Sequence, residues 1–156
     1  MTYRITGLAP QNFTALIGAD DATLATHHAV RVTAAHKPGF PCRITLEDAE
    51  PGESLILLNH ISHDVATPFR SSYAIYVRER ADVAADYIDA VPPVFEGRPL
   101  GLRAFDSEGM LRNAALALPG QADAKIRELF DSVDIDYIHA HNAAHGCFAA
   151  RVERHG

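Results

Sequence analysis

Residues 137–152 read YIHAHNAAHGCFAARV, two alternating apolar runs separated by a short polar segment. Alternation with a period of two predicts β-strands, because successive side chains of a strand point to opposite faces. With residues 142–146 as the turn, we expect residues 136–141 and 147–152 to pair as an antiparallel hairpin, with His141 opposite Cys147. One face would carry the apolar residues Ile138, Ala140, Phe148, Ala150 and Val152. The other would carry Tyr137, His139, His141, Cys147, Ala149 and Arg151.

Outward from this hairpin, short β-like runs dominate the chain. They cover residues 3–8, 29–34, 42–48, 54–60, 73–79, 100–106 and 110–118. Helical patterns are fewer: residues 11–17, 21–27 with Asp20 as N-cap, 81–88, and an amphipathic helix near 121–133 with one apolar stripe (Ala122, Ile126, Leu129, Phe130, Val133). Strands clustered along the sequence, with helices between the clusters, predict one α+β domain over residues 1–156. Its sheet should be largely antiparallel and could be barrel-like, with a few short helices.

Composition excludes several classes of function. The 156 residues carry a net charge of −6, and the basic residues are scattered, which argues against nucleic-acid binding. No apolar run is long enough to cross a bilayer, and residues 1–10 lack the apolar core of a signal peptide. Two cysteines are too few for a disulfide scaffold, so we expect reduced thiols and a cytoplasmic protein.

The polar face of the predicted hairpin is the candidate site. A solvated face would carry Thr, Lys and Glu, whereas cysteine is among the most buried residue types, so we expect this face to be partly covered. Partly covered strips of this composition line clefts. We therefore expect a small molecule or anion to bind at Tyr137, His139, His141, Arg151, Arg43 and Arg78. The last two come from other strands of the predicted sheet, and arginine suits carboxylate and phosphate groups.

A metal site is one hypothesis for this strip. Histidines at i and i+2 of a strand point the same way and can hold one ion, with Cys147 or His145 as a third ligand. The metal would be a divalent transition ion such as zinc, held by His139, His141 and Cys147. The spacing resembles the first half of a cupin metal motif, but the cupin glycines are absent and His145 stands in place of the Glu.

Two other hypotheses use the same residues. Cys147, His141 and Asn142 are the residue types of a Cys-His-Asn nucleophile system, which makes Cys147 the candidate catalytic residue. Alternatively the histidines are hydrogen-bonding spacers and Cys147 a small buried apolar residue that binds nothing.

Three segments carry a resemblance to a known family. They are KPGFPCRITLEDAEPGESLILL (37–58), TPFRSSYAIYVRE (67–79) and the opening stretch at 137–152. Together they resemble a bacterial family known only as domain of unknown function 1203. The resemblance implies a stand-alone bacterial domain of about this size. It implies no activity, cofactor or catalytic residue.

The sequence therefore leaves function open between classes, and whether the protein is an enzyme is left open with it. The preferred hypothesis is a small-ligand or metal-binding cleft lined by the His, Cys and Arg strip. One rival is a non-catalytic interaction or dimerisation protein, for which a homo-oligomer would be expected. The other is a thiol-dependent enzyme that uses Cys147.

Overall fold

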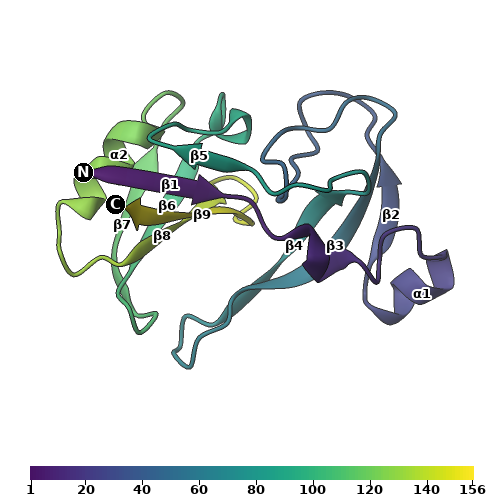
Figure 1. Cartoon of the computed structure of the whole chain (residues 1–156), viewed down its shortest axis with the longest axis horizontal. Coiled ribbons are helices and arrows are strands. Elements are labelled where there is room, and N and C mark those ends of the chain that lie inside the picture. Colours follow the sequence, from purple (N-terminus) through teal and green to yellow (C-terminus); the bar gives the residue numbers. More distant parts are fainter.

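The fold consists of two antiparallel sheets, and the computed structural model describes all residues from 1 to 156 (Figure 1). The strands are β1 (Thr2–Thr6), β2 (Val30–Thr33), β3 (Ser54–His63), β4 (Ser71–Arg78), β5 (Asp86–Ile88), β6 (Leu100–Phe105), β7 (Leu111–Ala117), β8 (Tyr137–Asn142) and β9 (Phe148–His155). The helices are α1 (Asp21–Thr26) and α2 (Ala122–Phe130), with 3-10 turns η1 (Pro10–Phe13) and η2 (Pro93–Phe95).

Six strands form the larger sheet in the order β5-β1-β9-β8-β6-β7, and three form the smaller one in the order β2-β3-β4. The larger sheet and α2 make up one end of the molecule, and the smaller sheet and α1 the other (Figure 1). This confirms the α+β class and the antiparallel pairing. Neither sheet closes into a barrel, so the barrel-like form does not occur.

The hairpin of β8 and β9 forms as the alternation predicts and lies in the middle of the larger sheet. Its register differs from the expected one by two residues, because Tyr137 pairs with Glu153 and His139 with Arg151. A β-bulge then separates the pair Ala140–Ala150 from the pair His141–Phe148. The extra residue in β9 turns Phe148 toward the histidines, where its ring centroid lies 5.1 Å from that of His139. Placing Phe148 on the apolar core face was therefore wrong, as was pairing His141 with Cys147.

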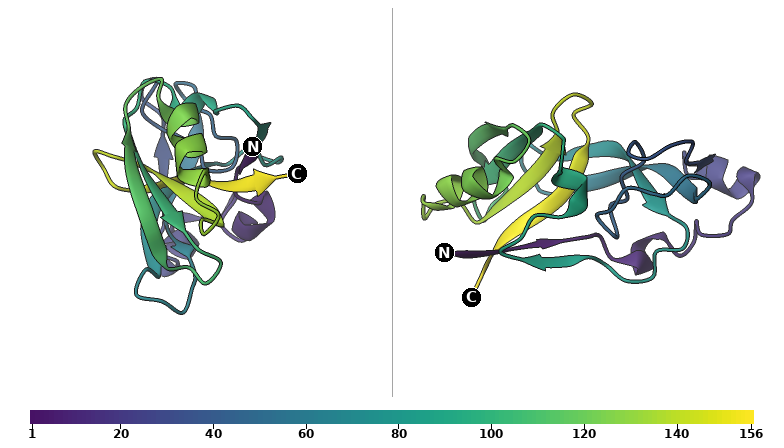
Figure 2. Two further views of the ribbon diagram at one scale, coloured as in Figure 1. Left: turned by 90° about the vertical axis from the view of Figure 1, so that its left-hand side faces the viewer. Right: turned by 90° about the horizontal axis from the view of Figure 1, so that it is seen from above.

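The main core lies between the larger sheet and α2, which covers one of its faces (Figure 2). Ile138, Ala140 and Val152 of the hairpin belong to the same core cluster as Ile126 and Phe130 of the helix, which confirms that the apolar stripe faces the core. The helix ends at Phe130, and the Val133 side chain is 91% exposed, so its place in the stripe was wrong. A second core packs against the smaller sheet and includes residues of β3, β4 and α1.

Three local expectations fail. In place of the helix expected over residues 11–17 there is only the 3-10 turn η1, and in the other two cases long-range contacts override local pattern. Residues 42–48 form a turn, closed by a hydrogen bond from the Leu46 N–H to the Cys42 carbonyl, and not a strand. Residues 81–88 are not a helix: Asp86–Ile88 pair with β1, and Asp86 accepts two hydrogen bonds from the Arg4 guanidinium. Helix α1 begins as expected, with the Asp20 side chain accepting a hydrogen bond from the Thr23 N–H.

No helix combines the length and apolar character needed to cross a membrane.

Candidate functional site

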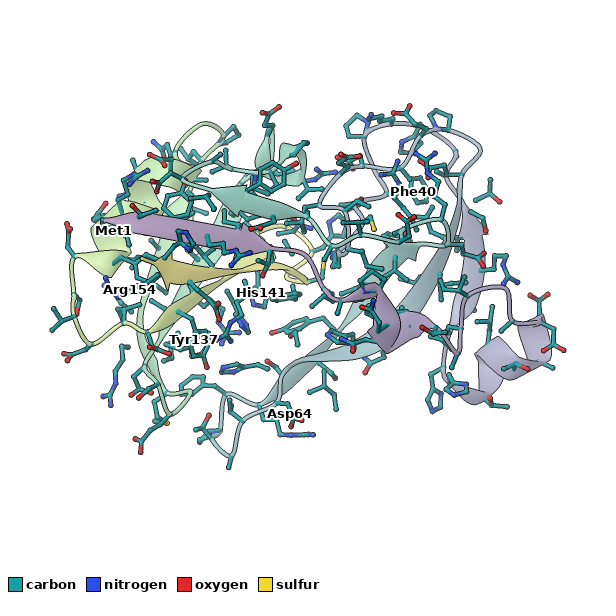
Figure 3. The ribbon with its side chains drawn as sticks, viewed as in Figure 1. Met1, Phe40, Asp64, Tyr137, His141 and Arg154 are labelled. Atoms are coloured by element: carbon teal, nitrogen blue, oxygen red, sulfur yellow. The ribbon has the colours of Figure 1, made fainter.

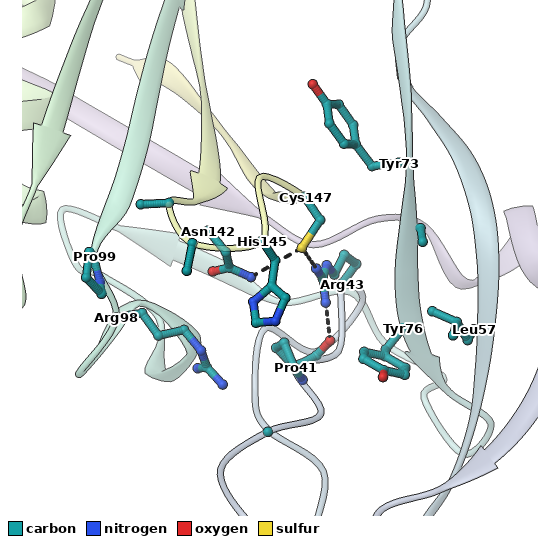
Figure 4. Close-up of a pocket in the computed structure, with 14 residues that line it drawn as sticks. Pro41, Arg43, Leu57, Tyr73, Tyr76, Arg98, Pro99, Asn142, His145 and Cys147 are labelled. Carbon is teal, nitrogen blue, oxygen red and sulfur yellow. Dashed lines mark hydrogen bonds between the residues drawn. The ribbon is translucent and has the colours of Figure 1, made fainter.

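The predicted strip is divided between two neighbouring places. Tyr137 and His141 lie in a buried layer between the two sheets (Figure 3), and the His139 ring lies next to both. Cys147 instead lines a pocket at the tip of the β8–β9 hairpin (Figure 4). Strand β8 positions all three ring side chains at alternate residues on one face, as a strand must. Cys147 follows in the turn between β8 and β9 and lies outside the face of β8 that carries these rings.

Histidine and aromatic rings fill the buried layer, and β3 contributes to it from the smaller sheet. His63 Nε2 lies 2.6 Å from the Tyr137 hydroxyl, and its Nδ1 lies 2.9 Å from the Phe69 carbonyl. The His139 ring lies edge-on to His63, with centroids 4.9 Å apart. These contacts connect the two sheets through side chains that are almost completely enclosed: His63 is 3% and His139 2% exposed.

Burial keeps His139 and His141 neutral. Desolvation, helped by the nearby His63 and Arg151, lowers the pKa of His139 to about 2. Desolvation also lowers the pKa of His141, and the Arg103 guanidinium acts in the same direction, although a hydrogen bond to the Gly146 carbonyl opposes it. Because an imidazolium would be desolvated and repelled here, the rings act as uncharged packing and hydrogen-bonding groups at neutral pH.

The pocket beside Cys147 has a volume of about 590 Å³ and lies where the hairpin tip meets β4 and the 39–43 segment (Figure 4). Its apolar walls come from Pro41, Leu57 and Pro99, and its rings from Tyr73 and Tyr76. The remaining polar lining is Arg43, Arg98, Asn142, His145 and Cys147. No aspartate or glutamate lines the pocket, in a chain whose net charge is −6.

Cys147 is held by hydrogen-bond donors. The Arg43 guanidinium donates from Nη2 to Cys147 Sγ at 3.2 Å, and Asn142 Nδ2 lies 3.7 Å from the same sulfur (Figure 4). Arg43 is fixed in turn by bonds from Nε to the Phe148 carbonyl (2.8 Å) and from Nη1 to the Pro41 carbonyl (2.6 Å). The turn at residues 42–48 places Arg43 beside Cys147. The same turn is the reason that the strand predicted for these residues does not form.

Arg43 is a buried cation without a carboxylate partner. Its side chain is 2% exposed, and the partners of its guanidinium are two carbonyl oxygens and the Cys147 sulfur. Burial lowers the pKa of Arg43, and negative charge on Cys147 opposes that effect. An unpaired buried charge costs several kcal/mol, and the two carbonyl oxygens and the Cys147 sulfur are the groups that offset this cost for Arg43.

Two predicted site residues, Arg78 and Arg151, do not line the pocket and are already paired with acidic side chains. Arg78 is buried among acids, with Nη2 2.6 Å from Glu53 and Nη1 3.0 Å from Glu47, and it does not line the pocket. Arg151 stacks on the Tyr137 ring at 3.9 Å and donates to Glu153 at 2.6 Å.

No group of three or more His, Cys, Asp or Glu side chains is arranged to hold a metal ion. The structure does not bring His139, His141 and Cys147 together: His141 Nδ1 is engaged by the Gly146 carbonyl, and the neighbours of Cys147 are Arg43 and Asn142. His145 lines the pocket apart from the buried histidines. Zinc binding at the strip therefore stays a prediction without a preformed ligand set.

Sequence reasoning missed His63, Tyr73 and Arg103 as parts of this region. Tyr73 lines the pocket, contacts the His141 ring with centroids 5.0 Å apart, and lies 3.4 Å from Arg103 Nη1. Their strands were predicted, but the packing of the two sheets that joins them was not. A usable signal was His63 itself, a polar residue at the end of a strongly apolar strand.

The comparisons with known proteins return one family. The family model described as protein of unknown function (DUF1203) matches residues 39–154, a range that contains both Arg43 and Cys147. No curated protein and no solved structure matches the chain.

Proposed function

The chain belongs to the family of proteins of unknown function DUF1203, and we propose that it binds a small organic molecule with a carboxylate group in the pocket between its two sheets. The buried Arg43 guanidinium at the wall of this pocket is the observation that carries the proposal. A guanidinium has five N–H donors, and three of those of Arg43 have protein acceptors. The remaining two are available to a ligand.

Charge favours an anionic ligand over a cationic one. Arg43 and Arg98 line the pocket and no acid does, although Arg98 is itself paired with Asp48 at 2.6 Å. Arg103 does not line the pocket, but its Nη1 lies 3.4 Å from the Tyr73 hydroxyl and its guanidinium carbon lies 5.7 Å from the centre of the Phe105 ring. A carboxylate would meet guanidinium groups and no acidic side chain in this pocket, and guanidinium groups bind it with good geometry.

The pocket walls favour an organic body on the ligand. Tyr73 and Tyr76 present rings, and Leu57 and the two prolines present apolar surface. A volume of about 590 Å³ lies within the range typical of small-molecule sites, roughly 300–1,000 Å³. An inorganic anion would leave these walls uncovered.

A patch of Tyr and Arg at the rim of an exposed surface would favour the rival hypothesis of an interaction protein. Tyr137 is 4% exposed and bonded to His63, and Arg151 is held by Glu153. These contacts support the ligand pocket over an interaction surface at this place.

Calorimetric titration with benzoate, against its neutral counterpart benzamide, tests the proposal. Because a charged hydrogen bond contributes about 1.5–3 kcal/mol, benzoate should bind at least about tenfold more tightly than benzamide. Arg43→Gln should abolish that preference, whereas Arg70→Gln, at an exposed arginine paired with Asp64, should leave it unchanged. Equal affinity for both compounds, or an equal effect of both substitutions, would contradict the proposal.

A further inference from the structure

We propose that Cys147 is a thiolate nucleophile that reduces organic hydroperoxides within this pocket. The inference rests on the proposed pocket and adds a reaction to it. It stands on three observations: the sulfur lines the cavity, a buried guanidinium lies 3.2 Å from it, and that guanidinium has no carboxylate partner.

The neighbours of Cys147 decide the class of reaction. In a hydrolytic Cys-His system the imidazole accepts the thiol proton and later returns it. No histidine is hydrogen-bonded to Cys147, whose sulfur has Arg43 and Asn142 as its partners, so the predicted Cys-His-Asn system is not assembled. Arginine stays protonated and cannot accept a proton, but it stabilises a thiolate permanently. This arrangement suits a reaction in which sulfur attacks without a general base.

Attack on a hydroperoxide meets that condition. The thiolate attacks the terminal oxygen of R–O–O–H, an S–O bond forms, the O–O bond breaks, and its electron pair leaves with RO⁻. The products are Cys147–S–OH and RO⁻, which takes a proton from water; sulfur is oxidised by two electrons and the peroxide is reduced by two. The two N–H groups of Arg43 without protein acceptors lie on the guanidinium beside the sulfur, where they can stabilise the charge that develops on the leaving oxygen.

The second cysteine is not available to complete the cycle. Cys42 is completely buried, and its sulfur accepts hydrogen bonds from the backbone N–H groups of Ile44, Thr45 and Arg78. The reductant is therefore a small external thiol, R′SH. It converts Cys147–S–OH to Cys147–S–S–R′ and water, and a second R′SH releases the thiolate, a proton and R′–S–S–R′. The sum is ROOH + 2 R′SH → ROH + H₂O + R′SSR′.

To test the proposal, the full chain is treated with cumene hydroperoxide at pH 7, and any sulfenic acid is trapped with dimedone. Peptide mass spectrometry then identifies the residue that carries the adduct. Since a free thiol is mostly protonated at this pH, Cys147 should react at least about tenfold faster than N-acetylcysteine. Because the pocket walls are apolar, Cys147 should also react faster with cumene hydroperoxide than with hydrogen peroxide. Cys147→Ser should give no adduct, and Arg43→Gln should slow the reaction about tenfold or more, while Arg70→Gln should not change it.

The wild-type comparison decides the proposal even if Arg43→Gln does not fold. A Cys147 that reacts no faster than N-acetylcysteine, or that shows no preference for the organic peroxide, overturns the peroxide reaction. Benzoate binding that persists in that case leaves the ligand pocket standing. Fast sulfenic acid formation without benzoate binding overturns the carboxylate ligand alone and supports the thiolate.

Discussion

At the scale of single residues, Arg43 and Cys147 make the site. The sequence marks Cys147 through its place in a histidine-rich hairpin, but nothing local indicates that Arg43 is its neighbour, because the two lie far apart in the chain and meet only through the turn at 42–48. Arg78 has the same residue type and is equally buried, yet Glu47 and Glu53 neutralise it. The presence or absence of a carboxylate partner distinguishes Arg78 from Arg43, to which we assign the proposed function.

The two cysteines should differ in reactivity. Cys147 lines the pocket and should be alkylated by iodoacetamide in the native protein. Cys42 is completely buried and its sulfur is enclosed by three backbone N–H groups, so it should react only after unfolding. Mass spectrometry of native and denatured samples should show one and two adducts respectively, and Cys147→Ser should show none in the native state. Native modification of Cys42 would contradict the packing described here.

At the scale of elements, the hairpin of β8 and β9 positions the site and α2 supports it from behind. Periodicity predicted both, because each has one apolar face against a core. It did not predict the bulge in β9, since the extra residue is specified by sheet packing and not by the hairpin's own pattern. The same holds for residues 86–88, whose helical composition is overridden by pairing with β1.

Helix α2 provides a matched pair of substitutions. Phe130 is 2% exposed in the main core, so Phe130→Ala should lower the free energy of unfolding by about 3–5 kcal/mol. Val133→Ala, three residues further on at an exposed position, should change it by less than about 0.5 kcal/mol. Chemical denaturation measures both. A loss below about 1 kcal/mol at Phe130 would mean that the helix does not pack as described.

At the scale of the whole molecule, the layer between the two sheets contains the neutral His139 and His141, which makes stability depend on pH. The folded-state pKa of His139 is about 2, below its ordinary value of 6.5, so the unfolded chain binds a proton that the folded chain does not. Stability is therefore complete above pH 6.5 and falls as the pH drops below it, by about 1.4 kcal/mol per pH unit. His141, whose pKa is lowered too, adds to this loss.

Urea denaturation between pH 7 and pH 5 should show this dependence. The contribution of His139 alone should reach about 2 kcal/mol at pH 5. His139→Gln removes the titrating ring, so the variant should start less stable at pH 7 but lose less on acidification. A wild-type stability that is constant or rises toward pH 5 would contradict a neutral, buried His139.

The central claim is that the buried Arg43 cation is balanced by a Cys147 thiolate at the pocket wall. The ultraviolet absorbance of the thiolate measures this directly, as the difference between the wild-type protein and Cys147→Ser at neutral pH. The arrangement at 3.2 Å predicts a difference equal to a single thiolate per chain, which Arg43→Gln should remove. A difference that is absent at neutral pH, and appears only in the range of an ordinary free thiol near about pH 8.5, would contradict the claim.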